Sequence, residues 1–189
     1  MSERRFGSLP LEAMTPDQKR VAEAIFAGPR STKGRLTGPF EALICSPGLA
    51  MPAQELGAHI RFRSSLPGAL NEMAIIMTAR RWTAQYEWHA HRQMALDAGL
   101  DSAIADAIAA GERPVLDAEG AAVYEFTAQL LADGQVTDQA WDDVVARWGK
   151  RGAADLIGAV GYYCLVSFAL NVDRYPLPGG REDPLRPLP

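Results

Sequence analysis

One long stretch without glycine or proline constrains the fold of this chain more than any other feature. Between Gly68 and Gly99 the sequence is compatible with helix throughout, and from Glu72 it runs EMAIIMTARRWTAQYEWHAHRQMALDAGL. A run of about 30 residues is long for one helix of a globular protein. The sequence therefore predicts a break inside the stretch and a helix on each side of it.

Thr83 is the best candidate for the position of this break. Threonine is a good N-cap, and the preceding pair, Arg80 and Arg81, suits the C-terminus of a helix because cations favour that end of the helix dipole. We therefore expect one helix that carries Glu72 and a second helix that begins at Ala84.

The second helix would place a glutamate and a histidine on one stripe. Spacings of three and four residues bring side chains together on a helix, and they gather four positions here: Ala84, Glu87, Trp88 and His91. Glu87 and His91 can then share a proton or a ligand. His89 lies about 200° from His91 around the helix, so the two histidines do not form a chelating pair. Of the two, we assign His91 to a candidate site.

These residues resemble a known family. The pattern of Glu72, the tripeptide Tyr86-Glu87-Trp88, His91, Ala95 and Gly99 is similar to the carboxymuconolactone decarboxylase family, which is related to alkylhydroperoxidase D. The segments GPFEALICSPGLA and LPGALNEMAIIM are also typical of family members that lack the redox cysteines. The resemblance covers about residues 38–115.

The chain departs from the peroxidase branch of that family at two positions. In that branch a glutamate precedes a CxxC pair by twelve residues, and a histidine follows the second cysteine by four. The matching positions here are Glu72 and His91, but Ala84 and Glu87 stand where the cysteines would be. The resemblance therefore favours the cysteine-free, decarboxylase-like branch.

The resemblance implies an all-α fold, a single-domain helical bundle of the alkylhydroperoxidase D-like type. We expect this domain to span residues 1–174, followed by a proline-rich tail at 175–189 that is irregular or extends across a neighbouring subunit. It also implies a homotrimer or homohexamer, a small acidic substrate and no cofactor.

The candidate site has the composition of an acid–base group. Glu72, Glu87 and His91 supply a carboxylate, an imidazole and a second carboxylate, which are suited to general acid–base catalysis. Trp88 and Ala84, on the same stripe, are the predicted substrate contacts. Two alternatives stay open: a helix-surface pair of Glu87 and His91 that contributes little, and a metal held by the three residues, although our assignment includes no metal.

Three classes of function are compatible with these residues. The first is a carbon–carbon lyase or isomerase-type enzyme that acts on a small carboxylated lactone or a related enolisable acid. The second is a peroxidase, which would need the fold to bring Cys45 or Cys164 to the site. The third is a non-catalytic binding or assembly protein on the same scaffold.

Composition excludes several partners. The 189 residues hold 23 acidic and 19 basic side chains, so no basic excess indicates nucleic-acid binding. The N-terminus lacks the apolar run of a signal peptide, and no uninterrupted apolar run approaches a membrane span. Two cysteines far apart in sequence favour reduced thiols. We therefore expect a cytoplasmic protein that binds neither nucleic acid nor membrane.

Elsewhere the sequence predicts further helices and one basic loop. The loop at 30–39 carries Arg30, Lys33 and Arg35, and it is either a solvated loop or a basic mouth that attracts an anion. His59 we interpret as structural. Expected helices follow Thr15 and lie at about 40–45, 51–64, 101–110, 117–132, 137–148 and 152–172.

Overall fold

The computed structural model describes residues 3–30 and 34–186. These residues form eight α-helices and two short 3-10 helices, joined by loops and turns. No strand occurs in these residues, so the expected all-α class is confirmed. The α-helices are α1 (Pro16–Ala27), α2 (Pro39–Leu43), α3 (Pro47–Arg63), α4 (Gly68–Arg81), α5 (Gln85–Asp97), α6 (Ser102–Ala110), α7 (Ala118–Asp133) and α8 (Asp138–Asp173). The 3-10 helices are η1 (Leu11–Ala13) and η2 (Pro178–Gly180).

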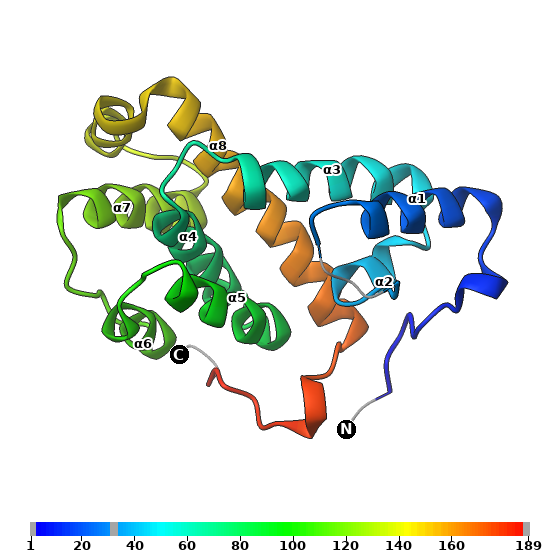
Figure 1. The fold of residues 1–189 in the computed structure, drawn as a ribbon. Helices are drawn as coiled ribbons and strands as arrows, with labels where there is room; N and C mark the ends of the chain where they lie inside the picture. The colour runs from blue at the N-terminus through cyan, green and yellow to red at the C-terminus, as the bar shows by residue number, and fades with distance from the viewer. Residues whose placement is uncertain (1–2, 31–33, 187–189) are drawn as a thin grey trace.

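The helix α8 joins two apolar clusters into one domain. In Figure 1 it runs diagonally between α1, α2 and α3 on one side and α4 to α7 on the other. The first part of α8 contributes Leu156 to the cluster of α4, α5, α6 and α7. Its later part contributes Tyr163 and Val166 to the cluster of α1, α2 and α3. The chain is therefore built around α8 and the almost wholly buried α4.

The break inside the long helical stretch is confirmed, but its cap differs from the predicted one. Thr83 does not begin α5. It ends α4 in the left-handed region, with φ of 48°, and the amide of Ala84 donates to the carbonyl of Ala79 at 2.8 Å. This bond and the one from Thr83 to Arg80 form a Schellman motif, whose left-handed position is usually a glycine. Ala84 occupies the N-cap of α5 and offers no capping side chain.

Other helix ends follow the residues that the sequence offers as caps. Thr15 and Gln18 form a capping box at α1, and Asp101, Asp117 and Thr137 cap α6, α7 and α8 through their side chains. Helix α3 begins at Pro47, four residues before the expected start, since proline fits the first turn. The two helices expected at about 137–148 and 152–172 appear as one element with a non-helical kink at Gly149.

The later part of the kinked helix α8 is strongly apolar. It contains an 18-residue window with a mean hydropathy of 1.6, which by length and composition would suffice to cross a membrane. Half of that window is buried within the chain, where α8 packs against α2, α3, α4, α5 and α7. The core helix of a globular protein has the same length and apolar composition.

The C-terminal tail packs on its own chain. Residues 175–186 are irregular except for η2, as the prolines indicate, and Leu185 is buried. The side-chain amide of Gln85 donates to the carbonyl of Leu185 at 2.7 Å and accepts from its amide at 2.9 Å. These two bonds hold the tail against the first turn of α5. The last three residues, 187–189, lie outside the described residues.

A buried ion cluster fastens the N-terminal segment to the end of α8. The guanidinium of Arg4 donates to Asp173 Oδ2 at 2.9 Å through Nε and to Glu41 Oε2 at 2.6 Å. The other carboxylate oxygen of Asp173 accepts from the amide of Phe6 at 2.7 Å. Asp173 is 1% exposed and Glu41 is 2% exposed, so loss of Arg4 would leave two buried carboxylates without their counter-charge.

We expect Asp173→Ala to lower the free energy of unfolding by about 3 kcal/mol, because it removes the buried carboxylate that pairs with Arg4 and leaves the amide of Phe6 without its acceptor. Urea denaturation monitored by circular dichroism measures this. The control is Asp17→Ala, which removes an ion pair with Arg20 whose side chains are 65% and 70% exposed, and should change stability by less than about 1 kcal/mol. Equal losses in the two variants would contradict a structural role for the cluster.

Candidate active site

The predicted acid–base residues meet in one buried group. His91 Nδ1 lies 2.6 Å from Glu72 Oε2, and His91 Nε2 lies 2.8 Å from Glu87 Oε1. Exposure is 4% for His91, 4% for Glu87 and 9% for Glu72. The imidazole therefore sits between two carboxylates, one from α4 and one from the preceding turn of α5, and the interpretation of Glu87 and His91 as a solvated surface pair is wrong.

The register of α5 explains this position. At 100° per residue, Ala84, Trp88 and Ala95 share the side that is buried in the α4–α7 cluster. A neighbouring side lines a cavity and carries Tyr86, Ala90 and Met94. Glu87 and His91 lie at the border of these two sides. Each can therefore contact α4 on one side and the cavity on the other.

The two carboxylates keep His91 protonated. Burial alone would lower the pKa of this imidazole, but the charge of Glu87 and the hydrogen bonds to Glu72 and Glu87 outweigh burial and raise the pKa to about 9. The ring of Tyr163 packs edge-on against the imidazole, with 4.9 Å between ring centroids, and limits its tilt. At neutral pH the site holds a fixed imidazolium, which can act as a proton donor.

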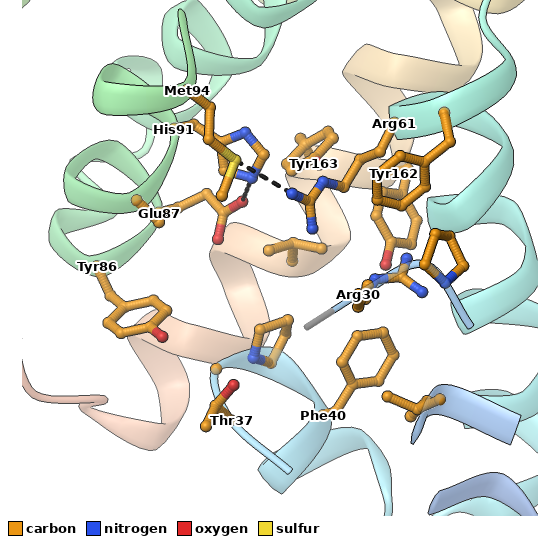
Figure 2. Close-up of a pocket in the computed structure, with 17 residues that line it drawn as sticks. Arg30, Thr37, Phe40, Arg61, Tyr86, Glu87, His91, Met94, Tyr162 and Tyr163 are labelled. Carbon is orange, nitrogen blue, oxygen red and sulfur yellow. Dashed lines mark hydrogen bonds and ion pairs between the residues drawn. The ribbon is translucent and has the colours of Figure 1, made fainter. Parts of the chain in front are cut away.

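The cavity beside His91 has a volume of about 430 Å³ and is lined by residues of α1, the loop after α1, α2, α3, α5 and α8. Figure 2 shows Glu87 and His91 on the side of α5, and Arg61 of α3 with Arg30 of the loop after α1 on the side facing them. The remaining lining residues are Ile25, Pro29, Thr37, Gly38, Pro39, Phe40, Phe62, Tyr86, Ala90, Met94, Tyr162, Tyr163 and Val166. This size suits a small metabolite.

Two arginines give the cavity a cationic side. Arg30 donates to the backbone carbonyl of Gln54 at 3.2 Å, and Arg61 reaches the sulfur of Met94 at 3.1 Å. Neither guanidinium forms an ion pair with a carboxylate of the described residues. Burial, together with the charge of Arg61, lowers the pKa of Arg30. Two neighbouring cations without a carboxylate partner on one side of a cavity favour the binding of an anion.

A glycine in α3 makes room for this cationic side. A Cβ atom at Gly57 would lie 2.3 Å from the hydroxyl oxygen of Tyr162 and 2.6 Å from Nη2 of Arg30. Both distances are far below van der Waals contact, so any larger residue would push the guanidinium and the tyrosine out of place. The glycine in mid-helix therefore positions part of the cavity wall.

The predicted substrate contacts lie elsewhere. Trp88 is 2% exposed and Ala84 is fully buried; both belong to the α4–α7 cluster and neither lines the cavity. The predicted stripe on α5 exists, but the edge that carries Ala84 and Trp88 faces the core rather than the cavity. His89 is half-buried and lies away from the site, as expected, and His59 contacts Asp155 at 3.1 Å in a structural link between α3 and α8.

The loop at 30–39 was expected to be either solvated or a basic entrance to the site, and it contributes one described basic residue to the cavity. Arg30 lines the cavity, whereas Arg35 is exposed and does not. Lys33 lies outside the described residues. Arg61, Tyr162 and Tyr163 also line the cavity and were not predicted from the sequence. The available signals were the unusual glycine within α3 and the pair of tyrosines that interrupts an otherwise apolar α8.

The donors of the site are arranged for proton exchange rather than for metal binding. Each nitrogen of His91 already faces a carboxylate oxygen, so the imidazole separates the two glutamates. Within residues 3–30 and 34–186, no group of three or more His, Cys, Asp or Glu side chains is placed to hold a metal ion. The cysteines are also remote from the cavity lining: Cys45 is exposed, and Cys164 accepts from the indole of Trp82 at 3.1 Å.

No protein-family model matches the sequence, and no curated protein matches it either. The resemblance to the carboxymuconolactone decarboxylase family therefore rests on the residues quoted for it above.

Because His91 is held as an imidazolium, the free energy of unfolding should depend on pH. Its folded pKa of about 9 is above the ordinary value of 6.5, so the stabilisation is fully present below pH 6.5 and is lost as the pH rises through 9. The expected loss is about 3 kcal/mol. Free energies of unfolding measured by urea denaturation across this range test it. His89→Gln should keep this pH dependence and His91→Gln should abolish it; the same slope in both variants would contradict the assignment.

Proposed function

We propose that this chain is a general acid–base enzyme, a carbon–carbon lyase of the decarboxylase type that acts on a small carboxylated lactone or a related enolisable acid. One observation carries the proposal. A buried imidazolium between two carboxylates lies on one side of a cavity, and two arginines without a carboxylate partner among the described residues lie on another. The resemblance to the cysteine-free branch supports the same reaction type.

The charges favour an anionic substrate. The group contains two carboxylates, Glu72 and Glu87, and three cations, His91, Arg30 and Arg61. The site therefore carries one net positive charge. That charge can balance the carboxylate that anchors the substrate, which lowers the cost of enclosing the charges in a half-buried cavity, whereas a second, reacting carboxylate stays uncompensated. A planar carboxylate also matches the fork of a guanidinium group.

The charges of the site also distinguish the substrate carboxylate that is anchored from the one that reacts. An arginine stabilises a carboxylate in its charged form, so a carboxylate held by Arg30 and Arg61 is not the one most easily lost as CO2. The reacting carbon would lie toward Glu87 and His91. Beside them, Ala90 and Val166 provide an apolar part of the wall, where a departing carboxylate is less well solvated than in water.

In the proposed reaction the bond between the carboxyl carbon and its neighbour breaks, and CO2 leaves without the bonding electron pair. That pair moves into the conjugated carbonyl group and gives an enolate. A proton from the Glu87–His91 pair is then delivered to carbon, and solvent returns a proton to the pair. Loss of a general acid typically lowers the rate by about 100- to 10,000-fold.

The test of this function uses a panel of small carboxylated lactones and enolisable acids. Turnover in D2O is followed by NMR, which detects both CO2 release and deuterium in the product. We expect His91→Gln to lower kcat by about 100- to 10,000-fold, because it removes the proton donor but keeps a hydrogen-bonding side chain.

His89→Gln is the matched control, since this half-buried histidine of the same helix lies away from the cavity. Its kcat should stay close to that of the wild type. A damaging His89→Gln with a harmless His91→Gln would overturn the assignment. Ligand binding without turnover in the wild type would favour a non-catalytic binding protein instead.

The peroxidase alternative requires a working thiol. We expect Cys45→Ser combined with Cys164→Ser to retain the wild-type turnover, because neither cysteine lines the cavity of His91. The same NMR assay measures this, together with peroxide consumption by wild type and variant. Peroxide consumption in the wild type that disappears in the double variant would support the peroxidase function.

Three further expectations from the sequence belong to the proposal. They are assembly as a homotrimer or homohexamer, a cytoplasmic location and the absence of a cofactor. Sedimentation at micromolar concentration tests the first, and a monomer would count against it.

A further inference from the structure

A second cavity, of about 190 Å³, lies between the last turn of α4, the end of α6 and the middle of α7. None of its lining residues lines the cavity of His91. Its polar side chains are Arg80 and Arg81 of α4, Glu112 after α6 and Tyr124 of α7. The remaining wall is apolar and includes Met77, Ile108, Ala128 and Leu131.

Arg80 is a buried cation without a partner. It is 6% exposed, and its Nε and Nη1 atoms are buried and form no hydrogen bond with any described residue. A buried guanidinium without hydrogen bonds or a counter-charge costs several kcal/mol, so proteins rarely retain one without a function. Because Arg80 lines the cavity, a counter-charge bound there would lie beside its guanidinium.

The surroundings of Arg80 do not neutralise it. Burial lowers the pKa of this guanidinium, and no neighbouring carboxylate offsets the effect. Glu125 forms an ion pair with Arg113, and Glu112 is exposed. Arg81, also exposed, adds a second positive charge at the rim. It donates a long hydrogen bond of 3.5 Å to the carbonyl of Leu131 and lies over the ring of Trp82. The half-buried hydroxyl group of Tyr124 can donate a hydrogen bond.

We propose that this cavity binds the carboxylate group of a small aliphatic acid, with Arg80 and Arg81 as the cationic contacts. The volume corresponds to about six water molecules, which fits a carboxylate with a short chain. The apolar wall of Met77, Ile108 and Leu131 would contact that chain. This site is independent of the acid–base function proposed above.

The experiment titrates the full-length protein with sodium butyrate against sodium chloride of equal ionic strength, and follows binding by saturation-transfer NMR. We expect saturable binding that Arg80→Met weakens by about tenfold or more, since a charged hydrogen bond is lost. Methionine keeps an unbranched apolar chain in the buried position, so folding should persist.

A second variant keeps Arg80 and removes the space. Ala128→Leu fills the cavity and should weaken butyrate binding as strongly, whereas Ala146→Leu on the exposed side of α8 should leave it unchanged. Arg30→Met removes a cation from the cavity of His91 and should preserve the part of the binding that depends on Arg80.

Two results would overturn the proposal. One is the absence of saturable butyrate binding, or binding that survives both Arg80→Met and Ala128→Leu, which would leave Arg80 solvated by water alone. The other is self-association that sedimentation detects in the wild type and not in Arg80→Met, because the carboxylate would then come from a second copy of the chain.

Discussion

The contacts of His91 with Glu72 and Glu87 fix how α4 packs against α5. A buried imidazolium is tolerated only where carboxylates surround it, and here they come from both helices at 2.6 and 2.8 Å. Such a buried group adds little net stability compared with well-packed apolar side chains, yet removal of one member typically costs about 3–5 kcal/mol. The group therefore specifies the register of the two helices more than it stabilises them, and the cavity depends on that register.

The turn between α4 and α5 also depends on a residue in an unfavourable conformation. Thr83 has φ of 48°, and left-handed backbone in a β-branched residue costs about 1–3 kcal/mol. The Schellman bonds from Thr83 and Ala84 offset this cost and reverse the chain within three residues. This short connection places His91 of α5 beside Glu72 of α4. A longer and more relaxed loop would allow α5 to rotate.

The sequence predicted the helices and the three acid–base residues, but not the other side of the cavity. Spacings of three and four identify Glu87 and His91 because one helix determines their relation. No local rule brings Arg61 of α3 opposite His91, since that contact depends on how α3, α5 and α8 pack around one another. Trp88 was misassigned for a related reason: the apolar stripe of α5 is wide, and periodicity alone does not tell which edge faces a core and which a cavity.

Under the proposed function, the two glutamates cannot have equal roles. Glu72 contacts Nδ1 of His91 and does not line the cavity, so it acts through the imidazole and is a positioning residue. Glu87 contacts Nε2 and does line the cavity. Because both ring nitrogens face a carboxylate, a proton can reach the substrate in two ways. Either Nε2 turns from Glu87 toward the substrate, or Glu87 accepts the proton and passes it on. Both routes start from Nε2, since Nδ1 points to a carboxylate outside the cavity.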